Sequence, residues 1–388
     1  MKKKIIFGAS VLIIITCFFV LLSMKEPKKE EPVQTPLTYE GSKVPDQISF
    51  EDYKNIDELM VDAKEIDYRD GNIFHPYILT DNQYLIGYIT DPPKNENDIL
   101  NTSYQEIVYL DLKTNDYTTI RRIDNPKENE NIFFLGANKN YFVYALSKGN
   151  SEIYLYDFFT GKERQLTSLS EFTKFDSSWT FYNDKIIFSA YHEQNAIFQT
   201  IVYSIKEDKI EFIEEGNSNN AVICNDKLYY LTADGTTHIT KLIEYNFEDQ
   251  SKTTLVEKQG QMDFIYQLFT TGNDLLFVIC SPTRFTLYQV DFETRTWYQV
   301  FYILNGNFIG LKNNYMYFNG AIAMNGPASM LSALYDFKNN VAYTTNGHCV
   351  LSNKGMVYFE RKPGEIPKGY SLTREYSTMK YITFNETE

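Results

Sequence analysis

Cysteine and tryptophan are scarce in this chain of 388 residues, which has four cysteines and two tryptophans. Cys17 lies within an apolar run near the N-terminus, so Cys224, Cys280 and Cys349 remain, and an odd number cannot all pair. No CxxC pair is present, and each of the three adjoins apolar, strand-like residues. The pattern predicts inert buried thiols and no disulfide framework.

Clustered positive charge is also missing. Lysine and arginine number 37 against 51 aspartates and glutamates, which gives a net charge of −14. Basic clusters occur only beside the N-terminal apolar run, so the electrostatic footprint of a nucleic-acid-binding protein is absent and nucleic acid is not expected as a partner. The acidic balance suits an exported, soluble domain.

Catalytic signatures are lacking too. The sequence contains neither GxSxG nor HExxH, and no glycine-rich phosphate loop follows a strand. The Asp-box phrase of sialidase propellers is missing, and residues 158–162 match quinoprotein blades only faintly, without their repeated tryptophan. We therefore predict no catalytic residue and no cofactor, while the question of enzymatic activity stays open.

Helical periodicity does not extend beyond about two turns after residue 72, and a strand repeat takes its place. Seven times a turn of Asn, Asp, Lys or Gly precedes an aromatic-rich strand, and these strands begin near Tyr84, Tyr141, Ile186, Leu228, Leu275, Tyr315 and Met356. Spacings of about 40 to 57 residues are typical of propeller blades. The expected fold is all-β, a seven-bladed β-propeller over residues 72–388, with a six- or eight-bladed ring as the alternative.

Each copy reads as inner strand, hairpin, second strand, loop, third strand, hairpin and outer strand. The last copy is the weakest, because residues 370–376 and 379–384 must supply its outer strands. If they do not, residues near 65–68 are expected to supply the closing strand. The 31 tyrosines and 28 phenylalanines are expected to fill the gaps between blades.

One copy carries a family resemblance. Residues 153–157 (IYLYD) followed by 160–167 (TGKERQLT) resemble the blade phrase of TolB-type propellers. The wider set of hairpins resembles the low-density-lipoprotein-receptor-like propeller domains of membrane-anchored or secreted Firmicutes proteins. The resemblance covers roughly residues 72–384 and implies extracytoplasmic binding or scaffolding, and no catalytic residues come with it.

The N-terminal sequence predicts the cellular location of the protein. Residues 1–4 include three lysines and form the predicted cytoplasmic tail, and residues 5–24 carry no charge over a length that spans a bilayer. An uncleaved transmembrane signal-anchor is favoured over cleavage or lipidation of Cys17. The predicted location is the cell membrane of a Gram-positive cell, with a single pass and the C-terminal domain extracytoplasmic.

Two segments link the anchor to the propeller. Residues 25–44 are rich in Pro, Glu, Lys, Gln and Thr and are expected to form a disordered tether. Residues 45–71 are expected to pack on the propeller or lend a closing strand, with Ser49 capping a short helix that carries Ile56 and Met60.

The candidate ligand-binding residues are His75, His348, Arg361 and Trp179. By topology all four histidines fall at one end of the propeller axis, and His75 and His348 begin inner strands of the adjoining first and last blades. That pair could bind a metal or an anionic group, and the sequence leaves open whether a metal binds. Arg361 lies in a long loop where it could meet an anion, and Trp179 could form an apolar wall beside the channel.

The sequence thus predicts a binding or scaffold module whose partner is an envelope or membrane protein or a wall-derived ligand. The alternative is a propeller enzyme, a hydrolase or lyase acting on glycans or peptides, which requires two carboxylates within about 10 Å at the channel mouth. A sensory ectodomain is a third possibility and needs a membrane partner, because the cytoplasmic tail is short.

Overall fold

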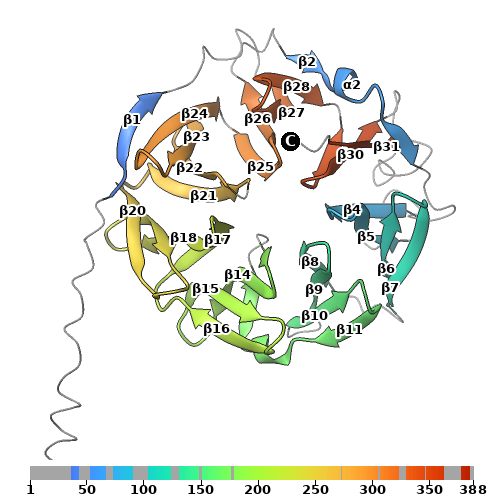
Figure 1. Ribbon diagram of the computed structural model, residues 1–388, viewed down its shortest axis with the longest axis horizontal. Coiled ribbons are helices and arrows are strands. Elements are labelled where there is room, and N and C mark those ends of the chain that lie inside the picture. The colour runs from blue at the N-terminus through green and yellow to red at the C-terminus, as the bar shows by residue number, and fades with distance from the viewer. Residues whose placement is uncertain are drawn as a thin grey trace, which may run out of the picture. The chain divides into compact units, whose positions relative to one another are not determined.

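Seven β-sheets surround a common centre in this protein. The computed structural model describes residues 36–42, 53–66, 73–90, 104–123, 131–147, 151–175, 179–271, 273–304, 306–322, 329–345, 347–361 and 377–384. From Leu37 onward the chain forms one compact unit built almost wholly of strands. Its sheets are arranged as the blades of a propeller (Figure 1), so the predicted seven-bladed fold is confirmed.

The predicted membrane segment at residues 5–24 lies outside the described residues. Within the described ranges, no helix has the length and apolar character needed to cross a membrane.

The first four blades add their strands in chain order from the centre outwards. Blade 1 contains β4 (Ile73–Leu79), β5 (Tyr84–Thr90), β6 (Tyr104–Asp111) and β7 (Asp116–Arg122). Blade 2 contains β8 (Asn131–Ala137), β9 (Tyr141–Ser147), β10 (Ser151–Asp157) and β11 (Lys162–Gln165), and is followed by the 3-10 helix η3 (Thr167–Leu169). Blade 3 contains β12 (Phe172–Phe175), β13 (Thr180–Tyr182), β14 (Lys185–His192), β15 (Ile197–Ser204) and β16 (Lys209–Ile213). Blade 4 contains β17 (Ser218–Cys224), β18 (Lys227–Asp234), β19 (Ile239–Tyr245) and β20 (Lys252–Gln259).

Blades 5 to 7 each take their outermost strand from the N-terminal segment. Blade 5 contains β21 (Phe264–Thr270), β22 (Leu275–Ser281), β23 (Arg284–Asp291) and β24 (Thr296–Leu304), and β1 (Thr38–Ser42) pairs with β24 in parallel. Blade 6 contains β25 (Gly306–Lys312), β26 (Tyr315–Ile322), β27 (Ser329–Asp336) and β28 (Val341–Thr345), and β2 (Lys54–Asn55) pairs with β28 in parallel. Blade 7 contains β29 (His348–Leu351), β30 (Gly355–Arg361) and β31 (Ser377–Thr383), and its fourth strand is β3 (Lys64–Ile66), antiparallel to β31.

The ring is therefore closed by β3, the N-terminal option that the sequence left open. Ile66 of β3 is buried in a cluster shared by blades 7 and 1, which includes Phe74, Val357 and Met379. Strand β31 is the third strand of the last blade, so residues 379–383 do not supply its outer strand. Because one blade takes strands from both parts of the chain, its ladder hydrogen bonds and buried side chains hold the circle shut.

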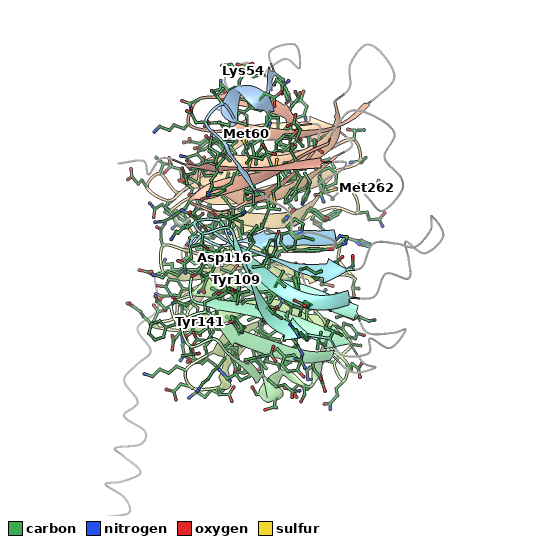
Figure 2. All side chains as sticks on the ribbon, turned by 90° about the vertical axis from the view of Figure 1, so that its right-hand side faces the viewer. Lys54, Met60, Tyr109, Asp116, Tyr141 and Met262 are labelled. Atoms are coloured by element: carbon green, nitrogen blue, oxygen red, sulfur yellow. The ribbon has the colours of Figure 1, made fainter. Side chains whose placement is uncertain are left out.

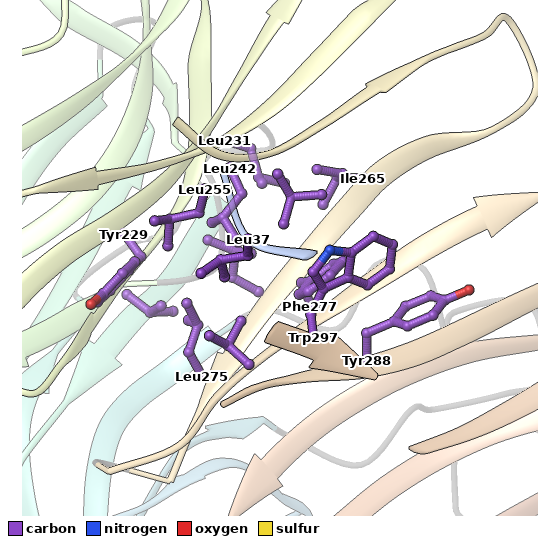
Figure 3. Close-up of a cluster of buried hydrophobic side chains, with 14 of the residues drawn as sticks. Leu37, Tyr229, Leu231, Leu242, Leu255, Ile265, Leu275, Phe277, Tyr288 and Trp297 are labelled. Atoms are coloured by element: carbon purple, nitrogen blue, oxygen red, sulfur yellow. The ribbon is translucent and has the colours of Figure 1, made fainter. Parts of the chain in front are cut away.

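The N-terminal segment departs from the sequence predictions in two places. Thr38–Ser42, which were assigned to the tether, form β1, because Leu37 before it is buried between blades 4 and 5 (Figure 3). The short helix α2 (Ile56–Leu59) begins after β2 and is capped by the Asn55 side chain, which accepts a hydrogen bond from the Asp57 N–H. Ser49, the predicted cap, lies outside the described residues.

Large aromatic side chains fill the spaces between blades. In the side view, side chains crowd the layers of strands (Figure 2). Many of the aromatic residues belong to the second strand of a blade, where both sheet faces are covered by neighbours; Tyr144, Tyr229, Phe188, Phe277 and Phe318 are fully buried. Their hydroxyls find partners: Tyr229 donates to a Glu244 oxygen at 2.9 Å, and Tyr144 donates to Glu163. Burial of each ring stabilises the interface between blades, and the paired hydroxyl avoids a desolvation penalty.

Candidate functional site

The inner strands surround a central channel with a cavity volume of about 900 Å³. Inner-strand residues of all seven blades line it, from β4, β8, β13, β17, β21, β25 and β29. A cavity of this size can enclose a small organic molecule. The channel is therefore the candidate binding site.

Several inner strands carry a β-bulge, which places an extra residue opposite the second strand. The bulges lie at Tyr77, Leu135, Tyr266 and Ile309. A bulge redirects the side chain locally. Tyr77 and Ile309 line the channel while 54% and 44% exposed, so the wall offers uncovered apolar surface.

Trp179 forms part of the channel wall directly before β13. Its ring stacks on Phe188 with centroids 4.0 Å apart, and the side chain is 7% exposed. Gly136 of the neighbouring blade lies so close that a Cβ there would be 2.9 Å from the Trp179 Cβ. Trp179 therefore joins blades 2 and 3 as well as lining the cavity.

His75 and His348 occupy equivalent positions of neighbouring blades. His75 pairs with Tyr88 and His348 with Phe359, each the fifth residue of its second strand. Each imidazole stacks on that partner, at 4.7 Å for Tyr88 and 6.3 Å for Phe359. The sequence interpretation correctly related the two positions through the repeat.

The two imidazoles nevertheless have separate partners. The Nε2 atom of His75 lies 3.0 Å from the Thr90 hydroxyl, and burial lowers the pKa of His75 to about 4. His348 contacts the edge of Tyr317, lines the channel, and also has a pKa lowered by burial. Neutral imidazoles favour stacking over binding anions. Among the described residues no group of three or more His, Cys, Asp or Glu could hold a metal ion.

The other candidates lie apart from these. His192 packs against Phe172 within blade 3, and His238 lies 3.3 Å from the Gln261 amide in blade 4. Arg361 ends β30, where its backbone pairs with Ser377, and its side chain lies outside the described part of the structure. The cysteines Cys224, Cys280 and Cys349 are free thiols; burial raises the pKa of Cys224 to about 11.

At the opposite end of the inner strands, hairpin side chains join neighbouring blades. Asp81 of blade 1 accepts hydrogen bonds from the Asn353 N–H at 2.9 Å and from its Nδ2 at 3.1 Å. Asn353 Oδ1 in turn accepts from the Asn313 N–H, and Asn225 Nδ2 donates to the Asn273 carbonyl at 3.1 Å. The turn residues that the sequence explained by backbone conformation therefore also connect the blades.

Lys312 is the channel residue that the sequence interpretation missed. The repeat predicts a turn at this position, but Lys312 ends inner strand β25 and lines the cavity. The side chain is exposed to the channel, where the surrounding protein atoms lower its pKa and the negative charge of Asp81 acts in the opposite direction. Comparing the copies of the repeat could have found it, because a lysine stands at a position that is neutral in the other blades.

Carboxylates are few in the described channel wall. Asp81 and Asp226 line it, and each already accepts a hydrogen bond, Asp81 from Asn353 and Asp226 from the Tyr182 hydroxyl. The pair of uncommitted, converging carboxylates that a glycosidase needs is not formed by the described wall.

Comparisons with known proteins agree with the fold. The sequence model of the KIB1-4 beta-propeller family matches residues 109–357, more than half of the chain. No curated protein matches the sequence.

Solved structures match at low identity. The β-propeller domain of the trilobed protease from Pyrococcus furiosus, described as having an open velcro topology, gives a TM-score of 0.52 at 12% identity, covering 83% of this chain and 97% of that one. Acylaminoacyl peptidase from Pyrococcus horikoshii gives 0.50 at 10% identity, covering 76% of this chain and 50% of that one. TolB from Acinetobacter baumannii gives 0.44 at 13% identity, covering 69% and 65%. At these identities the first two matches show the fold alone.

Proposed function

This chain belongs to the KIB1-4 beta-propeller family, which accounts for its fold, and we propose on separate grounds that it is a membrane-anchored, extracytoplasmic binding protein. Its channel holds a ligand, or a segment of a partner protein, at the cell envelope. The observation that carries this proposal is the cavity of about 900 Å³ formed by all seven inner strands, with exposed apolar side chains on its wall.

Binding is favoured over catalysis by the chemistry of the wall. Stacked rings and neutral hydrogen-bonding groups suit recognition, because aromatic faces contact a ligand without high entropic cost. The enzyme alternative requires two free carboxylates, whereas Asp81 and Asp226 are engaged in joining blades. A binding role therefore accounts for more of the described cavity.

The N-terminal sequence supports the proposed membrane anchor. Residues 5–24 are uncharged and follow three lysines, which keep the short N-terminus inside. In intact cells we expect the full chain to sediment with membranes and its propeller to be digested by added protease. Replacing Ile14 and Ile15 by arginine should release the protein from the membrane fraction. A protein that is protected from protease, or soluble without the substitutions, would contradict the proposed location.

The binding role is tested by a photo-crosslinking amino acid placed at Tyr77 in the full chain. Tyr77 is exposed within the channel, and Phe159, 96% exposed on the outer hairpin between β10 and β11, is the matched control. We expect an adduct in native membranes from the Tyr77 position and none from Phe159. The adduct mass separates a small ligand from a protein partner. No adduct at Tyr77, or equal adducts at both positions, would refute binding in the channel.

A further inference from the structure

Lys312 occupies a position in the repeat that the fold does not require to be charged. It is the last inner-strand residue before a hairpin and pairs with Tyr315. The equivalent residues of the other blades, identified by the same pairing or backbone hydrogen bond, are Thr80, Asn138, Tyr182, Cys224, Thr271 and Ser352. All six are neutral side chains, so turn geometry does not explain the lysine.

The lysine side chain projects from a part of the wall that is otherwise open. Along β25, Phe308 and Leu311 are buried between blades, whereas Gly310 and Lys312 share the opposite strand face. A Cβ added to Gly310 would meet no atom within 4 Å. The strand therefore leaves free space directly beside the lysine.

The ammonium group has no committed partner in the described part of the chain. Neither a hydrogen bond nor an ion pair joins it to another described residue. Asp81, the acid that influences it, directs its oxygens to Asn353 at 2.9 and 3.1 Å. Because Asp81 is engaged by Asn353 and is not hydrogen-bonded to the ammonium group in the described structure, the cation remains able to attract an anion in the cavity.

The rest of the wall suits an apolar body. Tyr77, Phe134, Trp179 and Tyr317 line the same cavity, and Ile309 precedes the open space at Gly310. We infer that the channel binds an organic anion, with its carboxylate at Lys312 and its aromatic or aliphatic body along the inner strands. This inference rests on the proposed binding function and names the class of ligand.

The test uses the full chain in detergent micelles with two ¹⁹F NMR probes of equal shape, 4-fluorobenzoate and the neutral 4-fluorobenzamide. Empty micelles correct for partitioning. We expect the wild type to broaden the benzoate signal in a saturable way and to affect the benzamide less. Lys312→Met should weaken benzoate binding about tenfold or more, the scale of one charged contact. Lys312→Arg should retain binding.

Two further variants distinguish the effect of the lysine charge from the effect of the free space beside it. Gly310→Phe should block binding although Lys312 remains, because the new ring fills the space beside it. Lys162→Met on outer strand β11 is the matched control and should bind as the wild type does. Melting temperatures of all variants establish that they are folded.

Three results would overturn the inference: no saturable binding of benzoate, equal binding of benzoate and benzamide, or unchanged binding by Lys312→Met. If crosslinking at Tyr77 still yields an adduct, the channel remains a binding site and only the anionic class of ligand is refuted. If crosslinking at Tyr77 also fails, the proposed function fails with it.

Discussion

At the scale of single residues, His75 makes the stability of the propeller depend on pH. Its imidazole is stacked on Tyr88 and close to the Thr90 hydroxyl, and burial lowers its pKa to about 4. Between pH 6.5 and 4 the unfolded chain binds a proton at this histidine that the folded chain does not. The free energy of unfolding therefore falls as the pH decreases through this window. The stability that comes from burying the neutral imidazole is fully present above pH 6.5.

We predict that at pH 5 this histidine alone lowers the free energy of unfolding by about 2 kcal/mol relative to pH 7.5. His75→Gln should remove that part of the pH dependence. Denaturant unfolding at both pH values measures it, and His238→Gln, an exposed loop substitution, is the control. Identical pH dependence in the two variants would contradict the assigned role of His75.

At the scale of elements, the hairpins between inner and second strands carry two functions. Asn and Asp accept the positive φ that a tight turn needs, as Asn183, Asn225 and Asn313 do here. Their side chains also reach the next blade, and the contact between Asp81 and Asn353 joins the first blade to the last. This pair therefore links the two ends of the repeat by a route separate from β3.

We expect Asp81→Ala to lower the free energy of unfolding by about 1 to 3 kcal/mol, because two hydrogen bonds to a charged acceptor are lost. Asn353→Ala should lower the free energy of unfolding by a similar amount. The double variant should lower it by less than the sum of the two single substitutions. Urea unfolding of the four proteins gives the coupling energy. Fully additive effects would show that the two side chains do not act together.

At the scale of the whole molecule, the N-terminal segment holds the ring closed. Strands β1, β2 and β3 add to blades 5, 6 and 7 in turn (Figure 1), and Ile66 of β3 is 4% exposed in the cluster between blades 7 and 1. The chain that enters from the N-terminus is thus part of the propeller itself. Loosening β3 is expected to open the seam between the first and last blades before the other blades unfold.

Ile66→Ala should lower the free energy of unfolding by about 2 kcal/mol or more, the usual result of truncating a buried isoleucine. Val61→Ala, at a side chain that is 78% exposed, should change the free energy of unfolding by no more than about 0.5 kcal/mol. Amide hydrogen exchange should quicken in β31 and β4 ahead of β18 on the far side of the ring. Uniform acceleration in all blades would argue against a local seam.

Much of the architecture could be read from the repeat, because its signals are local. The turn residues before Tyr84, Tyr141 and Tyr315 mark hairpins by their own backbone preferences, and strands follow directly. The tether boundary was wrong at Thr38–Ser42, because β1 forms through parallel pairing with β24, more than 250 residues away. Nothing in the five residues of β1 specifies that partner.

The residues of the candidate site also fall into those that the repeat predicted and those that it did not. The equivalence of His75 and His348 followed from the repeat, and the repeat also predicted Trp179 beside the channel, where it lies directly before β13. For Lys312 the repeat predicts only a turn, because composition alone does not say whether a lysine beside two asparagines points to solvent or into a channel. That distinction depends on the direction of the strand face relative to the axis.

By itself the sequence determined the elements of this protein: seven copies of a strand repeat, their hairpins and the aromatic side chains that pack between them. Only the tertiary structure decided which strand closes the circle, which hairpin side chains join blades, and that Lys312 faces a cavity beside Gly310. The physical reason is the distance along the chain over which each interaction acts. Turn preferences and strand alternation act over a few residues, whereas closure and the channel arise where blades distant in sequence meet.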